Sequence, residues 1–312
     1  METVIIKIND PNYPKRLLDL PQPPEQLYCR GRLELLNRPA VAIVGTRDCT
    51  RYGVAVAKEI AEKCVANGIV VISGGASGID TSAHLGALQI MGGESLPNTK
   101  YTPTSHLGAL QITGGAAGTI SVLGNGLDHC YPTENWEMQK QIEREGLLIS
   151  EYTNNLHANK ETFPQRNRIV AGLADAVVVV ECDFKSGTMI TVRVAKQIER
   201  EIFAVAGSIK SYASNGPNNL IKNEIAKIVT CPEDILDYFH IKTTDGQNKT
   251  EKPLQIGIDE KNVLDVLGRD EVHLDELIEK CGMPVHALMT LLTDMELSGL
   301  IQKLPGNYVV AK

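Results

Sequence analysis

This chain contains the stretch Ile69-Val70-Val71-Ile72-Ser73-Gly74-Gly75-Ala76-Ser77-Gly78-Ile79-Asp80, which decides its fold. Its first four residues are β-branched and apolar, which predicts a buried strand, and a helical pattern begins near Asp80. Between them, three glycines in six residues allow positive φ angles and close approach of a ligand to the backbone. Such a turn presents unpaired N–H groups to an anion. It is neither a Walker loop nor a complete G-x-G-x-x-G, so phosphate recognition and a plain tight turn both fit it.

The alternation of apolar runs and helical patterns continues on both sides of this stretch. The expected strands are Ala40–Val44, Ile69–Ile72, Thr119–Leu123, Leu147–Ser150, Ala176–Val180 and Ile202–Val205. The expected helices between them include Gly53–Asn67, Thr133–Arg144, Arg166–Ala174 and Thr188–Glu199. Continuous apolar strands joined by crossover helices are typical of a parallel sheet covered on both faces. We therefore predict an α/β fold, a doubly wound, Rossmann-like parallel sheet, over residues 39–240.

The two ends of the chain have different patterns. Residues 1–38 hold five prolines around a short amphipathic run and are expected to form an N-terminal arm packed on the larger body. Residues 241–253 are polar and aperiodic, which predicts a linker. Residues 254–312 carry three short helical patterns and a terminal hairpin with a Pro-Gly-Asn turn, which predicts a small winged-helix domain. Its six Lys and Arg against eleven Asp and Glu over 251–312 favour contact with protein over contact with phosphates.

Composition narrows the class of protein. The net charge of −7 excludes a coat of positive charge but not a local basic groove. No apolar run approaches the roughly 20 residues of a membrane-spanning helix, and the N-terminus lacks a signal-peptide pattern, so no membrane partner is expected. Seven scattered cysteines without a C-x-x-C make a disulfide framework or a zinc site unfavourable and predict a cytoplasmic protein.

One segment is repeated. The ten residues from His84 to Gly93 recur from His106 to Gly115 with one difference. Such a single repeat indicates a local tandem duplication, which leaves an insertion over about 84–115, with Glu94–Thr104 as its polar part. A tolerated surface insertion is favoured over a new site.

Small-residue loops follow several of the predicted strands. Ligands of open parallel sheets bind beyond the carboxyl ends of the strands, where these loops gather. The loops are Gly45-Thr46-Arg47, Ser73 to Gly78, Gly124-Asn125-Gly126 and Ala206-Gly207-Ser208, and Ser186-Gly187-Thr188 begins a helix. Two other strands are followed by Glu151-Tyr152 and Glu181-Cys182. A row of backbone donors on one edge suits a polymer better than a single phosphate group.

Cations occur on the same edge, namely Arg47, Arg51, Arg166, Arg168 and Lys185. The segment Phe163-Pro164-Gln165-Arg166-Asn167-Arg168 places an aromatic ring beside two arginines at a helix start. Stacking of a base on such a ring contributes about 1–3 kcal/mol, and arginines hold phosphates. In the alternative, Phe163 belongs to the core and the arginines pair with acids such as Glu161 or Asp175. No catalytic or metal-binding spacing is found, and Asp80 is interpreted as a helix cap.

Taken together, these elements resemble the DprA/Smf family of bacterial DNA-processing proteins. The matching elements are Val41–Arg47, Ser73–Asp80, Gly124–Asp128 with Tyr131-Pro132, Phe163–Leu173, Lys185–Thr188 and Ala206–Ser208, and the C-terminal pattern is also similar. The resemblance implies an extended Rossmann fold that binds and protects single-stranded DNA and helps to load RecA recombinase onto it. It further implies a homodimer, no catalysis and no cofactor. The amino-terminal helical domain of longer members is not expected here.

The resemblance also assigns candidate DNA-binding residues. Arg47 corresponds to the arginine of a Gly-Ser-Arg turn, with Thr46 in place of the serine. The full candidate set is Gly45, Thr46, Arg47, Ser73, Gly74, Gly75, Ser77, Gly78, Asn125, Phe163, Arg166, Asn167, Arg168, Lys185, Ser186, Gly187 and Thr188. Ser77 and Gln165 stand where basic residues are usual, which predicts weaker DNA binding or reliance on self-association, and a flatter salt dependence.

Two alternatives stay open. One is a nucleotide-binding enzyme on a related Rossmann scaffold, similar to nucleotide phosphoribohydrolases, with Glu151 as the residue to test. Those proteins use a Pro-Gly-Gly-x-Gly-Thr loop, which this chain lacks. The other is a family member that mainly captures proteins through its acidic winged helix.

Overall fold

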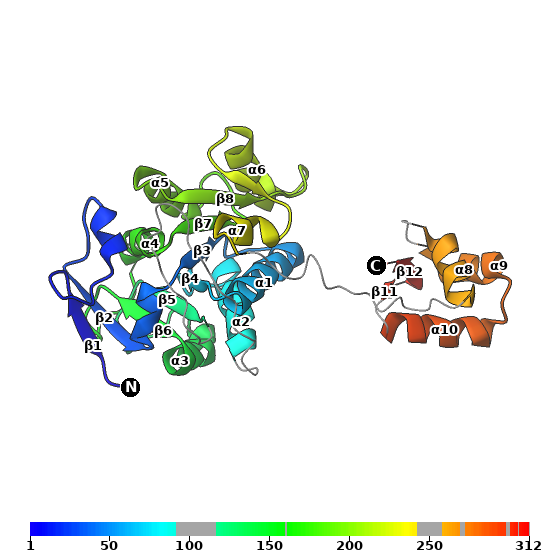
Figure 1. Cartoon of the computed structure of the whole chain (residues 1–312), viewed down its shortest axis with the longest axis horizontal. Helices are drawn as coiled ribbons and strands as arrows, with labels where there is room; N and C mark the ends of the chain where they lie inside the picture. The colour runs from blue at the N-terminus through cyan, green and yellow to red at the C-terminus, as the bar shows by residue number, and fades with distance from the viewer. Residues whose placement is uncertain are drawn as a thin grey trace. The chain divides into compact units, whose positions relative to one another are not determined.

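The computed structural model describes residues 1–91, 117–159, 161–241, 258–268, 272–297, 300–304 and 306–311. The chain divides into two compact units, Met1–Thr243 and Thr244–Lys312 (Figure 1). The repeat's second copy, the last two residues of its first copy and residues 242–253 of the expected linker lie outside the described residues.

The first unit is built on a nine-stranded sheet with the order β1-β2-β6-β5-β4-β3-β7-β8-β9. The strands are β1 (Val4–Lys7), β2 (Gln26–Gly31), β3 (Ala40–Val44), β4 (Val70–Ser73), β5 (Thr119–Leu123), β6 (Leu147–Ser150), β7 (Ala176–Val179), β8 (Glu201–Val205) and β9 (Lys227–Val229). In this order, every neighbouring pair in the run β6-β5-β4-β3-β7-β8-β9 is parallel. The pairs β1–β2 and β2–β6 are antiparallel. All residues of β3 to β7 are buried, which is why these strands have continuous apolar sequences. The predicted doubly wound parallel sheet is confirmed.

Helices cover both faces of this sheet. They are α1 (Arg51–Ala66), α2 (Ile79–Met91), α3 (Trp136–Glu145), α4 (Thr162–Leu173), α5 (Thr188–Gln197), α6 (Asn215–Lys222) and α7 (Glu233–Tyr238). Helices α1, α2 and α3 pack in succession on one face, and α4 packs against α5 on the other (Figure 1). Since each crossover helix runs back from the carboxyl edge, the loops that begin α1, α2, α4 and α5 meet at that edge.

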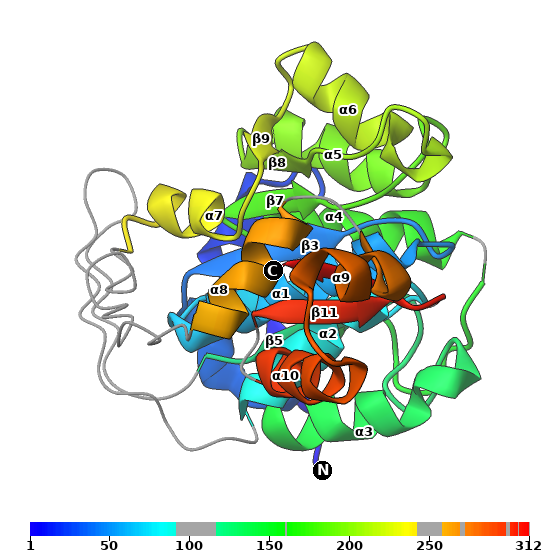
Figure 2. The same ribbon diagram turned by 90° about the vertical axis from the view of Figure 1, so that its right-hand side faces the viewer.

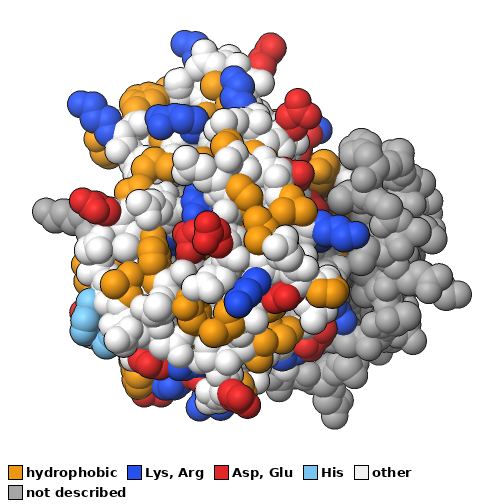
Figure 3. Space-filling view, turned by 90° about the vertical axis from the view of Figure 1, so that its left-hand side faces the viewer, with side chains coloured by type: hydrophobic (Ala, Val, Ile, Leu, Met, Phe, Trp, Pro, Cys, Tyr) orange, Lys and Arg blue, Asp and Glu red, His pale blue; other side chains and the backbone are white. Residues whose placement is uncertain are grey.

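The N-terminal residues are part of the main sheet. Strand β2 pairs with β6, and β1 forms the outer edge. The turns η1 (Lys15–Asp19) and η2 (Leu33–Asn37) add buried leucines to the core. Arg16 forms an ion pair with Asp175 at 3.2 Å and donates to the carbonyl of Leu173 at 2.9 Å. This segment is therefore fixed to the body by pairing, packing and charge. The face that carries β1 and β2 shows cations and carboxylates interspersed among hydrophobic side chains (Figure 3).

The second unit is a winged helix. Its elements are α8 (Ile258–Leu267), β10 (Val272–His273), α9 (Leu274–Cys281), α10 (Val285–Leu297), β11 (Ile301–Leu304) and β12 (Tyr308–Ala311), shown in orange and red in Figure 2. The strands form a sheet with the order β10-β12-β11. Leu277, Leu288 and Leu292 are fully buried in its core. In the hairpin, Gly306 and Asn307 take positive φ angles of 83° and 62°, as the expected turn requires.

All seven cysteines are free thiols. The described residues contain no helix long and apolar enough to cross a bilayer. They also contain no group of three or more His, Cys, Asp and Glu side chains placed to hold a metal ion.

Candidate nucleic-acid interface

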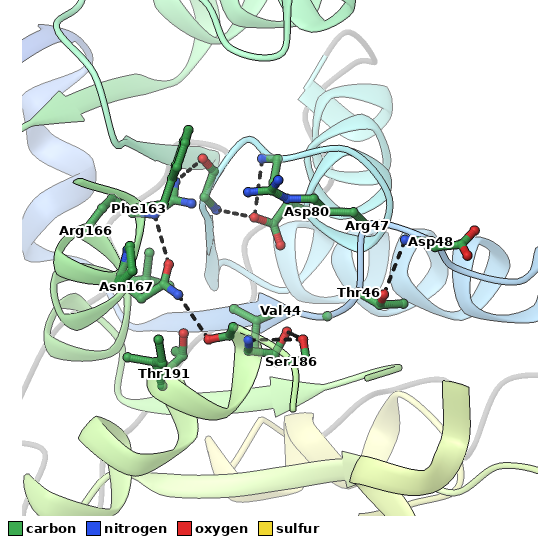
Figure 4. Close-up of a pocket in the computed structure, with 18 of the residues that line it drawn as sticks. Val44, Thr46, Arg47, Asp48, Asp80, Phe163, Arg166, Asn167, Ser186 and Thr191 are labelled. Atoms are coloured by element: carbon green, nitrogen blue, oxygen red, sulfur yellow. Dashed lines mark hydrogen bonds between the residues drawn. The ribbon is translucent and has the colours of Figure 1, made fainter. Parts of the chain in front are cut away.

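A cleft lies where the chain reverses its direction across the sheet. Strands β3 and β7 are parallel neighbours, and the chain runs from β3 toward β4 but from β7 toward β8. Ligands of open α/β sheets bind at such a switch point, because the loops on either side diverge. Here the cleft measures about 600 Å³ and is lined by Thr46, Arg47, Gly74, Phe163, Arg166, Asn167, Ser186 and Thr191, among others (Figure 4). Residues from four of the predicted loops and helix starts therefore meet in one place.

The loop after β3 is held rigidly from below. A Cβ atom on Gly45 would lie 2.4 Å from Cγ1 of Ile79 and 2.8 Å from the carbonyl of Glu181, so only glycine fits there. The amide of Thr46 donates to the Glu181 carbonyl at 2.6 Å, and the Thr46 carbonyl accepts from the Ile79 amide at 3.2 Å. The role of Gly45 is thus close packing, and Arg47, two residues further along the chain, is exposed.

Glu181 follows a strand at this edge of the sheet, but no role in the site was predicted for it from the sequence. It is buried, and its carboxylate accepts from the amide of Thr50 at 2.8 Å and from the Thr50 hydroxyl at 2.6 Å. The Thr50 hydroxyl in turn caps α1 by accepting from the Gly53 amide at 3.1 Å. A Cβ atom on Gly53 would meet the Glu181 carboxylate at 2.3 Å. The signal in the sequence was a lone glutamate at the end of a buried strand.

Arg47 and Phe163 lie together at the mouth of the cleft. The guanidinium carbon of Arg47 is 5.4 Å from the centre of the Phe163 ring, a cation–π distance. Phe163 stands in the first turn of α4, where Asn159 Oδ1 accepts from the amides of Glu161 and Thr162 at 2.9 Å. Tyr131 contacts Phe163 with ring centres 5.3 Å apart and is 51% exposed. An exposed cation and two aromatic rings thus lie together beside the start of α4.

Two backbone amides of the glycine loop are hydrogen-bonded within the protein. The amides of Gly74 and Ala76 donate to Oδ2 of Asp80 at 3.2 and 3.4 Å. Gly78, with φ at 83°, has no room for a Cβ because the Thr46 carbonyl would lie 2.4 Å away. Within the described residues, the amides of Ser77 and Gly78 have no hydrogen-bond partner. The Asp80 carboxyl therefore occupies two amides of the loop from inside, and the amides of Ser77 and Gly78 at its tip are left for a ligand.

Two other candidates of this region are internal. Ser73 is fully buried at the end of β4, and its hydroxyl donates to the carbonyl of Ile43 at 2.7 Å. Gly75 is also buried, with φ at 72°. Both residues shape the loop from inside.

Arg166 braces the floor of the cleft. It is 5% exposed and donates to the carbonyls of Gly74 and Val122, while its Nε donates to Oδ1 of Asn167 at 3.1 Å. Burial lowers the pKa of Arg166 and raises the pKa of Asp80, and each group's charge partly offsets the shift of the other. The guanidinium thus ties the ends of β4 and β5 to α4.

Arg168 and Asn167 are also engaged within the protein. Nη2 of Arg168 forms an ion pair with Oε1 of Glu151, so one of the two arginines does pair with an acid. Glu161 and Asp175, named as possible partners, are not the acid involved. Asn167 lines the cleft and donates from Nδ2 to the carbonyl of Gly187 at 3.2 Å.

The loop after β7 forms the opposite wall. Lys185 and Gly187 are exposed, and a Cβ on Gly187 would meet nothing within 4 Å. Oγ of Ser186 accepts from the amide of the buried Thr188 at 3.2 Å, which begins α5 (Figure 4). This wall offers an open backbone and one exposed ammonium group.

Asn125 is fixed below the surface. It is 1% exposed and donates from Nδ2 to the carbonyls of Gly126 at 2.9 Å and His129 at 2.8 Å. Its role in the structure is to hold the turn after β5.

Comparison with known proteins identifies the family to which this chain belongs. Residues 4–95 and 103–240 match the family model of DNA recombination-mediator protein A, and residues 248–307 match the DprA winged helix domain. The chain belongs to the DprA/Smf family. The match covers both units, so the predicted resemblance is confirmed.

Relatives in the DprA/Smf family span most of the chain. Protein Smf of Escherichia coli is 33% identical, over 95% of this chain and 74% of its own length. DNA processing protein DprA of Streptococcus pneumoniae is 38% identical, over 74% of this chain and 73% of its own.

Two solved DprA structures are similar as well. The S. pneumoniae DprA structure has a TM-score of 0.65 and 35% identity, covering 76% of this chain and 74% of that one. The structure of DprA from Helicobacter pylori, which concerns its single-stranded DNA binding mode, has a TM-score of 0.62 and 29% identity. It covers 76% of this chain and 95% of that one. This chain is therefore a DprA-family DNA-processing protein.

Proposed function

We propose that this DprA-family protein binds single-stranded DNA along the carboxyl edge of its main sheet. The observation that carries the proposal is the exposed Arg47 guanidinium over the Phe163 ring at the switch-point cleft. A base that stacks on Phe163 leaves its phosphate within reach of Arg47 and of the amides of Ser77 and Gly78. The H. pylori relative, described as binding single-stranded DNA, supports the choice of ligand.

The distribution of charge defines the strength of this binding. Arg166 is buried and Arg168 is paired, whereas Arg47, Arg51 and Lys185 are exposed near the cleft. Ser77 and Gln165 are exposed and uncharged. Few phosphates are thus neutralised, and the affinity falls only modestly with salt, because each neutralised phosphate adds about 0.7 to the slope for single strands.

A binding titration tests this function. Fluorescence anisotropy of a labelled oligonucleotide, single-stranded or duplex, is followed across a salt series. Arg47→Ala is expected to weaken single-strand binding about tenfold, or about 1.4 kcal/mol, without changing the melting temperature. Arg144→Ala is the matched control, since Arg144 is exposed in the last turn of α3, next to the amino end of β6. Unchanged binding by Arg47→Ala contradicts the proposal.

We infer that the protein acts in the cytoplasm without catalysis or cofactor, as a homodimer that protects the strand and promotes RecA loading during transformation and recombination. Free thiols fit a reducing compartment. Strand exchange by RecA on DNA covered with single-strand binding protein is expected to speed up on addition of this protein, and sedimentation measures the dimer. Hydrolysis of a nucleoside monophosphate that Glu151→Gln abolishes would instead support the nucleotide-binding enzyme.

A further inference from the structure

A second cleft of about 440 Å³ lies beside the Arg47 and Phe163 site. Tyr131 lines this cleft, the switch-point cleft and a small hollow of about 70 Å³ between them. The second cleft is also lined by Trp136, His129, His157 and Asp128. Because Tyr131 also contacts Phe163, the second cleft continues the candidate DNA path.

Four of the residues that line this cleft carry aromatic rings. Trp136 is 41% exposed at the start of α3, although large apolar side chains are usually covered. The rings of His129 and His157 stack with centres 3.8 Å apart and planes at 29°. The Lys140 ammonium lies 4.9 Å from the centre of the Trp136 ring. Exposed rings along a groove are the feature on which proteins stack successive bases of single strands.

The walls of the cleft are fixed before any ligand arrives. The carbonyl of His129 accepts from Asn125 Nδ2 at 2.8 Å and from Gln139 Nε2 at 3.0 Å. Nε2 of His129 lies 3.1 Å from the carbonyl of Asn155. Since a carbonyl only accepts, Nε2 of His129 carries the hydrogen of this contact. A preformed site loses little entropy when a ligand binds.

The chemistry of the cleft suits a base better than a phosphate. Two cations that contact its lining residues are paired with carboxylates, Arg30 with Asp128 at 2.5 Å and Lys140 with Glu143 at 2.9 Å. Asp128 is half exposed, so its other oxygen is an acceptor for a ring N–H or an exocyclic amine. Stacking faces and acceptors without free positive charge match the face and the edge of a nucleobase.

We propose that this cleft is a second base-binding subsite for the strand anchored at Arg47 and Phe163. The proposal rests on the proposed single-strand binding and adds the direction in which the strand runs, past Tyr131 toward Trp136. A strand on this path places one base on Phe163 and a later base on Trp136.

The chain's only tryptophan reports directly on this subsite. Trp136 fluorescence is followed during titration with single-stranded DNA, in parallel with the anisotropy of a labelled oligonucleotide. Quenching is expected to saturate with the same dissociation constant as the anisotropy change. An oligonucleotide with normal bases at the anchor and abasic sites beyond it is expected to bind without quenching. Binding without any quenching by normal DNA overturns the subsite but leaves the proposed function intact, whereas absence of binding overturns the function itself.

Variants with oligonucleotides of two lengths give a second test. Trp136→Ala is expected to weaken binding of a long strand about tenfold and to leave the shortest binding strand unaffected. Trp136→Phe keeps an aromatic face and is expected to restore most of the long-strand affinity. Equal loss for both lengths, or no loss for either, contradicts the subsite. Because Trp136 is exposed, its replacement is not expected to unfold the protein.

Discussion

Glu181 and Thr50 form a two-point contact beneath the loop that carries Arg47. The buried carboxylate accepts from the amide of Thr50 at 2.8 Å and from its hydroxyl at 2.6 Å. The same threonine caps α1, so β7, the loop after β3 and the start of α1 are joined through one carboxylate. The position of the exposed Arg47 thus depends on a residue that a DNA strand need not touch.

Replacing this carboxylate is expected to loosen the loop. Glu181→Gln removes the charge and puts an N–H donor against a donor amide or hydroxyl, which costs about 1–3 kcal/mol in the free energy of unfolding. Single-strand affinity falls too, because Arg47 is no longer held over Phe163. Denaturant unfolding and anisotropy measure the two effects. The control is Glu59→Gln, at an exposed position of α1, and equal stability of the two variants would refute the role assigned to Glu181.

Arg166 and Arg47 are expected to differ sharply when each is replaced. Arg166→Met leaves the carbonyls of Gly74 and Val122 without their donor and Asp80 without its nearby cation, so the free energy of unfolding falls by about 2–4 kcal/mol. Arg47→Ala removes an exposed side chain and changes stability by less than about 0.5 kcal/mol. Thermal melts and oligonucleotide binding, measured on both variants, distinguish the structural role of Arg166 from the DNA contact made by Arg47. A stable Arg166→Met protein that has lost DNA binding would make Arg166 a direct contact instead.

The central sheet was predictable because its strands are buried on both faces. Thr119–Leu123 and Leu147–Ser150 coincide with β5 and β6, since a fully buried strand leaves a continuous apolar run. Strands β1 and β2 were not predicted. Only one of the four β1 residues is buried, so β1 lacks a continuous apolar run. Strand β2 pairs with β6, which lies far along the chain, so no local sequence pattern predicts that pairing.

The sequence grouped the candidate residues at one edge of the sheet, but it did not predict which of them face solvent and which are held inside the protein. Sequence placed Arg47, Arg166 and Arg168 at one edge, yet which guanidinium faces solvent depends on distant carbonyls and on Glu151. Asp80 was interpreted as a helix cap, whereas its carboxylate binds the amides of the preceding loop. Such roles depend on tertiary contacts that spacing does not encode.

His84 is expected to make stability depend on pH. Burial, with a smaller effect of the Arg166 charge, lowers the pKa of His84 to about 3, so the ring is neutral in the folded protein. Its Nδ1 lies 2.7 Å from the Thr119 hydroxyl, which itself donates to the Val71 carbonyl. In the unfolded chain the ring takes up a proton below about pH 6.5. Its contribution to stability is therefore complete above that pH and is lost as the pH falls toward 3, by at most about 1.4 kcal/mol per unit.

His84→Asn provides the comparison for this pH effect. The amide nitrogen of asparagine occupies the place of Nδ1 and keeps a donor for the Thr119 hydroxyl, but it does not titrate. Unfolding free energies of the two proteins are measured from about pH 7 to pH 4. The difference between them is expected to shrink as the pH falls. Parallel curves would show that His84 titrates alike in the folded and unfolded states.

Thiol labelling is expected to follow burial. Burial raises the pKa values of Cys29 and Cys64 to about 12, so both are protonated and shielded in the folded protein. Cys231 is exposed. At about pH 8, iodoacetamide is expected to alkylate Cys231 first and to reach Cys29 and Cys64 only after unfolding, as mass spectrometry of peptides shows. Early labelling of Cys64 would contradict its burial.

Restoring charge at the edge of the sheet is expected to strengthen DNA binding. Ser77 and Gln165 are exposed near Arg47 and Phe163, where the family pattern predicts basic residues. Gln165 accepts from the Tyr152 hydroxyl at 2.9 Å and has no ion pair to lose among the described residues. Ser77→Arg with Gln165→Lys adds two phosphate contacts, so the slope of log affinity against log salt steepens by about 1.4. Anisotropy titrations at several salt concentrations measure this slope, with the same two substitutions in an Arg47→Ala background as control. An unchanged slope would mean that the strand does not pass these positions.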